Sequence, residues 1–118
     1  IISRGTLLIE DVPFEAMRVP LAYFEAAGID MLANRTSLYI HPDTVGRDGV
    51  QPFEVPCGAH PGVISDMQPF FVLLALAARG VSRIYDYRYP ERIAYARELA
   101  RFLGDGSITA EPGRITVE

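Results

Sequence analysis

The segment SDMQPFFVLLALAA, residues 65–78, is the most informative stretch of this 118-residue chain. Ser65 stands where a helix N-cap is expected, and Gln68, three residues later, would complete a Ser-x-x-Gln capping box. Because residues 70–78 are all apolar, we expect a helix that has no face for water and is buried. Asp66 would then be a carboxylate in the first turn of a buried helix, and it is the main candidate for a catalytic group.

Two other segments of the chain resemble one another. Gly, Ile and Asp have the same relative positions in residues 5–11, GTLLIED, and residues 80–86, GVSRIYD. Each segment precedes a helical pattern that ends close to a glycine, Gly28 or Gly104, as a left-handed C-cap does. A predicted hairpin follows each glycine. These patterns indicate an internal repeat.

The repeated elements have predicted bounds. The helices span residues 14–27 and 90–103, and the hairpins pair residues 29–32 with 37–41 and residues 107–111 with 114–118. Pro20 lies inside the first helical pattern and is expected to kink the helix or delay its start. In the second helix, three- and four-residue spacing places these residues on the inner face: Ile93, Ala96, Leu99, Ala100 and Leu103.

The two copies differ in what precedes them. A predicted strand at residues 51–55 and the buried helix come before the second copy, and neither comes before the first. We therefore expect residues 51–118 to form a complete unit of strand, helix, strand, helix, strand, strand. Residues 1–50 would form a partial unit of strand, helix and hairpin with a linker, HPDTVGRDG. Together they predict one fragment of an α/β (α+β) domain.

Composition narrows the class of protein. Apolar residues make up 49% of the chain, the net charge is −4, and all eleven cations are Arg and none is Lys. No stretch concentrates these cations, which argues against nucleic acid or an anionic membrane surface as the partner. The longest apolar run is too short to cross a bilayer, and no signal peptide pattern opens the chain, so we expect a cytoplasmic protein. The single Cys57 allows no internal disulfide or metal cluster, and we interpret it as structural.

Several short elements resemble the enolpyruvyl transferases. That family carries a His-Pro pair, then Phe-Pro-Thr-Asp-Met-Gln, a long apolar helix, and Glu-Asn-Arg-Phe before the next helix. This chain has His60-Pro61, Ser65-Asp66-Met67-Gln68 and Glu91-Arg92 in the corresponding places. Within the family it is most similar to the UDP-N-acetylglucosamine 1-carboxyvinyltransferases. It departs from their pattern at Val63-Ile64, Pro69-Phe70 and Tyr89-Pro90-Glu91.

The resemblance implies a fold and a reaction. The fold is an inside-out α/β barrel of repeated βαβαββ units, of which this chain would hold one complete unit and part of a second. The reaction moves enolpyruvate from phosphoenolpyruvate to the 3′-hydroxyl of UDP-N-acetylglucosamine, a step in peptidoglycan precursor synthesis. The family requires no metal or organic cofactor. The partners implied are these two small molecules and the remainder of the parent enzyme.

The resemblance also implies roles for single residues. Asp66 corresponds to the catalytic carboxylate at the sugar hydroxyl, and Arg92 to the arginine of Glu-Asn-Arg-Phe. Tyr87, Arg88 and Tyr89 correspond to the strand end that approaches the nucleotide sugar, and His60 is a further candidate for substrate binding. The family's lysine has no match in a chain without Lys. We therefore expect the isolated chain to be inactive.

Other interpretations stay open at the level of the sequence. Asp66 could only complement a helix dipole, Arg92 could be a surface arginine, His60 could be a turn residue, and the tyrosines could follow strand alternation. The chain could derive from a 3-phosphoshikimate 1-carboxyvinyltransferase, or it could be a non-catalytic repeat module that binds a nucleotide sugar or a protein. An incomplete first unit would leave a strand edge unpaired and favour self-association.

Overall fold

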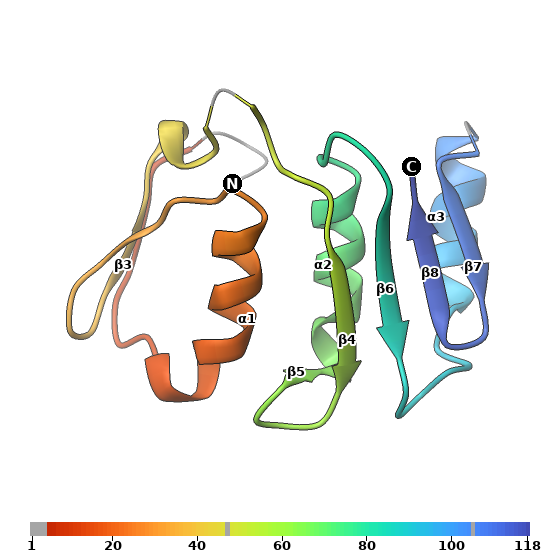
Figure 1. Cartoon of the computed structure of the whole chain (residues 1–118), viewed down its shortest axis with the longest axis horizontal. Coiled ribbons are helices and arrows are strands. Elements are labelled where there is room, and N and C mark those ends of the chain that lie inside the picture. Colours follow the sequence, from red (N-terminus) through yellow and green to blue (C-terminus); the bar gives the residue numbers. More distant parts are fainter. Residues whose placement is uncertain (1–4, 47, 105) are drawn as a thin grey trace.

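The computed structural model describes residues 5–46, 48–104 and 106–118, which form α-helices and two β-sheets (Figure 1). The elements in chain order are β1 (Leu7–Ile9), α1 (Phe14–Ala26), β2 (Leu32–Ala33), β3 (Leu38–Ile40), the 3₁₀ turn η1 (Pro42–Thr44), β4 (Glu54–Gly58), β5 (Val63–Ile64), the 3₁₀ turn η2 (Ser65–Met67), α2 (Gln68–Ala75), β6 (Ser82–Asp86), α3 (Ala94–Leu103), β7 (Ile108–Glu111) and β8 (Arg114–Val117). The predicted α/β class is confirmed.

The two sheets confirm the internal repeat. The smaller sheet has the order β1-β3-β2 and is antiparallel, and the larger has the order β5-β4-β6-β8-β7. In the larger sheet β6, β8 and β7 are antiparallel, whereas β4 runs parallel to β6. Ile9 pairs with Leu38 in the first unit as Ile84 pairs with Ile115 in the second. The series β1, α1, β2, β3 therefore matches β6, α3, β7, β8, and within residues 5–118, as far as they are described, β4 and α2 precede only the second series. A division of the chain at residue 50 stays a prediction.

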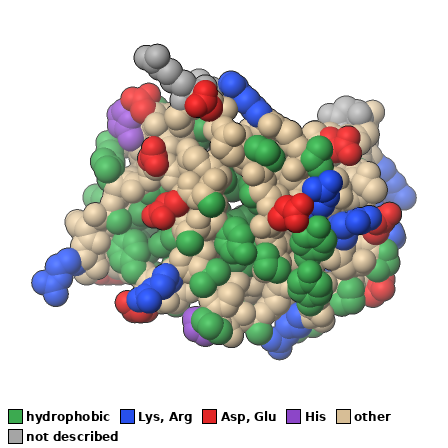
Figure 2. Space-filling model, in the orientation of Figure 1, with side chains coloured by type: hydrophobic (Ala, Val, Ile, Leu, Met, Phe, Trp, Pro, Cys, Tyr) green, Lys and Arg blue, Asp and Glu red, His purple; other side chains and the backbone are tan. Residues whose placement is uncertain are grey.

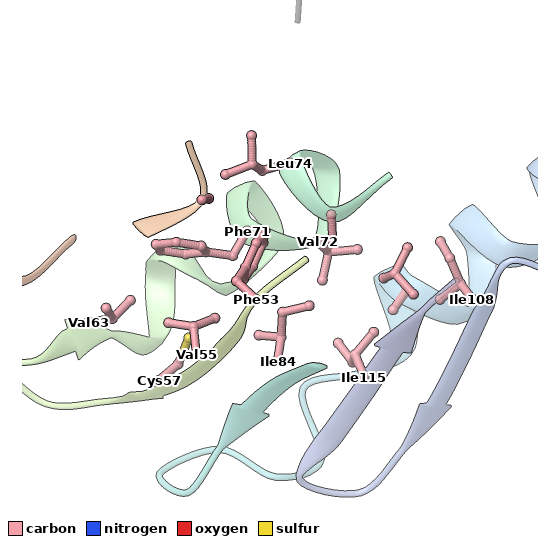
Figure 3. Packing of buried hydrophobic residues seen from close by; sticks show 14 of the residues in the cluster. Phe53, Val55, Cys57, Val63, Phe71, Val72, Leu74, Ile84, Ile108 and Ile115 are labelled. Carbon is pink, nitrogen blue, oxygen red and sulfur yellow. The ribbon is translucent and has the colours of Figure 1, made fainter. Parts of the chain in front are cut away.

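The helices pack on one face of each sheet and share one core. In Figure 1, α2 and α3 lie behind the five-stranded sheet, and α1 stands between β3 and α2. Phe71 of α2 joins these layers, because its ring packs at 5.3 Å from Phe24 of α1 and at 5.8 Å from Phe53. Figure 3 shows Phe71 above Val55 and Phe53, with Ile84 and Ile115 continuing the apolar layer toward α3. The first unit is thus attached to the second through α1 and α2.

The start and the faces of α2 correct two sequence predictions. Ser65 is not an N-cap: it opens η2, and its hydroxyl lies 3.0 Å from Asp86 Oδ1 and 3.3 Å from the Gly58 carbonyl oxygen. Gln68 forms no capping box either, because it is buried and its Oε1 accepts a hydrogen bond from the Tyr95 hydroxyl at 3.1 Å. The helix ends at Ala75. Phe70 on this helix is exposed, so the prediction that the all-apolar sequence would bury every face of the helix is wrong.

Other element bounds also differ from the predictions. β4 begins and ends three residues later than expected, because its pairing with β6 extends to the register Cys57 opposite Asp86. α3 begins at Ala94, since residues 90–93 form a turn. Of the residues predicted on its inner face, Ile93 directly before the helix and Ala96 within it are buried, whereas Leu103 at its end is exposed. α1 runs from Phe14 through Pro20, which is buried, so the proline does not delay its start.

Candidate functional site

The candidate site lies where β4 and β6 end. Both strands point the same way (Figure 1), so the loops that follow them lie at one edge of the sheet. In α/β sheets such carboxyl ends of parallel strands are where ligands commonly bind. The loop after β4 carries His60, η2 carries Asp66, and the segment after β6 carries Arg88, Tyr89 and Arg92. Two parts of the chain that are distant in sequence, residues 58–66 and 88–92, therefore meet there.

A pocket of about 400 Å³ joins these segments. Its lining residues are Gly58, Ala59, His60, Ile64, Ser65, Asp66, Arg88, Tyr89 and Arg92. The structure therefore brings five of the six sequence-predicted site residues to one pocket. The sixth, Tyr87, lies outside it: its ring stacks on Tyr85 at 6.2 Å, and both line a neighbouring pocket of about 590 Å³.

Asp66 and Arg92 form an ion pair at the pocket. Arg92 Nη1 donates to Asp66 Oδ1 at 2.6 Å, and the side chains are 78% (Asp66) and 37% (Arg92) exposed. The hydrogen bond to Asp66 raises the pKa of Arg92, which keeps the guanidinium charged. Exposed ion pairs contribute little to folding stability. The pair therefore matters more for holding an accessible carboxylate in one orientation than for stabilising the fold.

Tyr89 brings the second arginine into the site. The Arg92 guanidinium carbon lies 4.4 Å from the centre of the Tyr89 ring, and that of Arg88 lies 5.4 Å from it. Arg88 Nε also donates to the Tyr89 hydroxyl at 3.2 Å. The pocket thus holds two guanidinium groups against one carboxylate. Such groups bind phosphates and carboxylates through paired hydrogen bonds, so the arrangement suits an anionic ligand.

On the face shown in Figure 2, arginine and acidic side chains lie among hydrophobic ones. Among the described residues no group of three or more His, Cys, Asp or Glu side chains could hold a metal ion. Within the same residues, no helix combines the length and the apolar character that a membrane span needs.

Sequence reasoning did not identify Asp86 as part of the site. Asp86 lies at the end of β6, is 1% exposed, and accepts hydrogen bonds at Oδ1 from the backbone N–H groups of Arg88 (2.9 Å) and Tyr89 (2.8 Å) and from the Ser65 hydroxyl. The sequence did carry a signal, because Asp86 is one of the residues shared by the two repeats. That signal indicated a repeat and said nothing about contacts with η2.

Cys57 lies behind the site and is buried in β4. Burial, and secondarily the nearby Asp86 charge, raises the pKa of its thiol to about 12. A thiol that stays protonated near neutral pH is neither a nucleophile nor a good metal ligand. These properties agree with the structural role that the sequence predicted.

Comparison with known proteins identifies relatives by sequence and by fold, although no protein-family model matches the chain. It is 32% identical over 101 residues to UDP-N-acetylglucosamine 1-carboxyvinyltransferase of a Nitratiruptor species, a match that covers 86% of this chain and 23% of the relative. It is 32% identical over 99 residues to the enzyme of that name from Sorangium cellulosum, with 84% and 23% covered.

The fold comparison gives a similar result. The enolpyruvyl transferase NikO from Streptomyces tendae superposes with a TM-score of 0.78 at 21% identity, over 97% of this chain and 26% of that chain. The chain thus spans about a quarter of the length of the proteins it matches. The resemblance predicted from the sequence is confirmed: this chain is similar, in sequence and in its repeated α/β fold, to part of an enolpyruvyl transferase.

Proposed function

We propose that this chain is part of an enolpyruvyl transferase that moves enolpyruvate from phosphoenolpyruvate to the 3′-hydroxyl of UDP-N-acetylglucosamine, for peptidoglycan precursor synthesis in the cytoplasm. The observation that carries the proposal is the Asp66 carboxylate, held at 2.6 Å by Arg92 and open to a pocket with further cationic groups. The relatives at 32% identity bear the name of this activity.

Asp66 is the proposed catalytic group. While the sugar hydroxyl oxygen bonds to the central carbon of phosphoenolpyruvate, its proton must leave, and a carboxylate within hydrogen-bond reach can accept or direct it. The methylene carbon of phosphoenolpyruvate takes up a proton as its double bond opens. In the next step phosphate leaves the central carbon and the methyl carbon gives up a proton, which restores the double bond. The Arg92 contact orients one carboxylate oxygen, and the high exposure of Asp66 leaves the group accessible to a substrate.

The other predicted residues are proposed to bind substrate. Arg88 and Arg92 would bind phosphate or carboxylate groups of the ligand. The Tyr89 ring would lie beside both guanidinium groups and contact the ligand. His60 would contact the sugar from the loop after β4. Tyr87 lies outside the pocket, so it would contact only a ligand that extends past the end of β6.

The chain is proposed to work only with the remainder of the parent enzyme. It spans about a quarter of its relatives, and it has no lysine to supply the cation that the family uses. We expect no phosphate release when the chain alone is mixed with phosphoenolpyruvate and UDP-N-acetylglucosamine. Apolar surface on the first unit would pack against the rest of the enzyme, or against a second copy of the chain when the rest is missing.

A titration with UDP-N-acetylglucosamine, followed by backbone amide shifts in NMR, tests the proposal. We expect shifts in residues 58–66 and 88–92, and their loss in Asp66→Asn. Glu98→Gln is a matched control, because Glu98 is an exposed carboxylate paired with Arg101 at 2.5 Å on α3, away from the pocket. A folded sample with no shifts would contradict binding of this sugar nucleotide, and shifts with shikimate 3-phosphate alone would favour the sister enzyme.

A further inference from the structure

The buried carboxylate of Asp86 connects the two segments that carry the Asp66–Arg92 pair. On one side it lies 3.0 Å from the hydroxyl of Ser65, the residue directly before Asp66. On the other side it accepts from the backbone N–H groups of Arg88 and Tyr89. All three contacts converge on one atom, Oδ1. A single oxygen atom therefore links η2 to the segment after β6.

Further hydrogen bonds carry this link to Arg92. The Arg92 backbone N–H donates to the Tyr89 carbonyl oxygen at 3.0 Å, which closes the turn that Asp86 begins. The Arg92 guanidinium then lies over the Tyr89 ring and reaches Asp66. Because Ser65 and Tyr89 are both held by Asp86, the separation of Asp66 and Arg92 depends on a residue that lines a different pocket from theirs.

The two oxygens of Asp86 differ in their surroundings. Oδ1 accepts three hydrogen bonds, while Oδ2 is buried and has no hydrogen-bond partner among the described residues. A buried carboxylate is costly unless donors compensate its charge. The buried Asp86 carboxylate is present although its Oδ2 is unpaired within the described part of the chain. A need of the site for one oxygen, Oδ1, that accepts all three hydrogen bonds explains this.

We propose that Asp86 is a positioning residue, which fixes η2 and the segment after β6 so that Asp66 and Arg92 meet. This role rests on the proposed function, in which the Asp66–Arg92 pair is the proton-accepting centre of the enolpyruvyl transfer. Asp86 itself is not proposed to touch substrate.

The test reads the Asp66–Arg92 pair directly, without ligand, in the complete chain labelled with ¹⁵N-arginine. Asp86→Ala removes all three contacts, and we expect the Arg92 guanidinium hydrogens to exchange with water roughly tenfold faster, the order expected for a lost hydrogen bond to a charged group. Asp86→Asn keeps an oxygen at the Oδ1 position and replaces only the unpaired Oδ2, so it should restore slow exchange.

Two further variants separate positioning from general destabilisation. Ser65→Ala removes the contact with Asp86 on the Asp66 side, together with the 3.3 Å contact to the Gly58 carbonyl oxygen, and leaves the Arg88 and Tyr89 contacts of Asp86 in place. We therefore expect a smaller acceleration at Arg92 with unchanged Arg88 and Tyr89 amide shifts. Ser82→Ala is the control, because Ser82 is buried at the opposite end of β6, where its hydroxyl oxygen accepts from the Phe53 N–H at 3.2 Å. It should leave Arg92 unchanged.

The outcomes are distinct from those of the ligand titration. Wild-type exchange at Arg92 in Asp86→Ala would overturn the positioning role, and so would equal acceleration in Ser82→Ala. If Asp86→Ala does not fold, Ser65→Ala decides, and unchanged exchange there overturns the role. A chain that binds no UDP-N-acetylglucosamine but shows the expected exchange would contradict the proposed binding of this sugar nucleotide by the chain and would leave the role of Asp86 standing.

Discussion

The two repeat units have the same strand pairing, yet their apolar residues are buried to different extents. Ile84 in β6 is 0% exposed, whereas Ile9 at the matching position of β1 is 38% exposed. Leu7 and Leu8 of β1 are also exposed. Since the pairing is the same, the difference must come from what covers each sheet.

The cover of the second unit is β4 with α2. β4 extends the sheet beside β6, and α2 packs against β6, β8 and α3. At the corresponding place in the first unit, between α1, β1 and β3, the structure has an apolar pocket of about 300 Å³. Met17, Leu21 and Phe24 of α1 line it together with Leu38 and Ile40 of β3.

A sheet face becomes stable by packing against a second layer, and local strand pairing does not replace that layer. The second unit has its layer and also carries the candidate site, so Asp66, Asp86 and Arg92 stand on the better packed half of the chain. The first unit contributes mainly through α1, whose aromatic rings complete the packing around Phe71. The following predictions test this division.

The largest effect is expected for Phe71→Ala. This ring is buried and contacts Phe24, Tyr23 and Phe53, so its loss leaves a cavity where the two units meet. Replacing a buried phenylalanine with alanine typically costs about 3–5 kcal/mol of unfolding free energy. Urea unfolding followed by circular dichroism measures it. Phe70→Ala is the matched control, because Phe70 is the neighbouring residue on α2 and its ring is exposed. This substitution should change the free energy of unfolding by less than about 0.5 kcal/mol.

The matched pair Ile84→Ala and Ile9→Ala tests the comparison itself. Ile84→Ala is expected to cost about 2–5 kcal/mol, as for other buried isoleucines. Ile9→Ala should cost less than about 1 kcal/mol, because a partly exposed side chain loses less transfer free energy. Both values come from the same urea experiment. Equal losses at the two positions would mean that β1 is covered in solution, and the comparison would fail.

Local signals explain why much of this repeat could be predicted from the sequence. The β7–β8 hairpin was predicted because Pro112-Gly113 marks its turn, and Gly113 has a positive φ of 77°. The helix ends at Gly28 and Gly104 were likewise marked by residues that accept a positive φ. Such signals come from residues adjacent in sequence, so they can be interpreted without knowledge of tertiary contacts.

The candidate site was predicted only in part, because its details depend on distant contacts. The resemblance to known enzymes suggested five residues that the structure places at one pocket. The role of Ser65 was missed because its hydroxyl contacts Asp86, 21 residues away in sequence. Tyr87 was grouped with Tyr89, but β6 ends at Asp86, so the regular alternation of a strand does not extend to Tyr89. The ring of Tyr87 instead stacks on that of Tyr85 and lines the neighbouring pocket.

Because leucine side chains are exposed on strands of the first unit, we expect the chain to associate weakly with itself. Leu8 in β1 and Leu32 in β2 are both exposed on short strands of the smaller sheet. The double variant Leu8→Lys, Leu32→Lys should shift a concentration-dependent sedimentation profile toward monomer, because charge on an exposed strand opposes association. Val81→Lys is the control, since Val81 is exposed just before β6 in the covered unit. A monomer at all concentrations in the wild-type chain would contradict this prediction.

The smallest effect concerns Cys57, which lies in β4, a strand with no counterpart among the described residues of the first unit. Burial raises the pKa of its thiol from 9.0 to about 12 in the folded chain. Below pH 9 the thiol is protonated in both states and contributes no pH dependence. Between pH 9 and 12 the unfolded chain releases the proton while the folded chain keeps it, so stability falls as the pH rises.

Cys57→Ala should make this decline shallower without removing it, because burial also raises the pKa of Tyr95 in the same direction. Urea midpoints at pH 8, 9, 10 and 11, measured under reducing conditions, give the slope for each variant. Tyr95→Phe provides the second comparison and should flatten the curve mainly above the ordinary tyrosine pKa of about 10. If the wild-type and Cys57→Ala slopes coincide, the thiol titrates as it does in the unfolded chain, and β4 is not covered as tightly as the contrast between the two units requires.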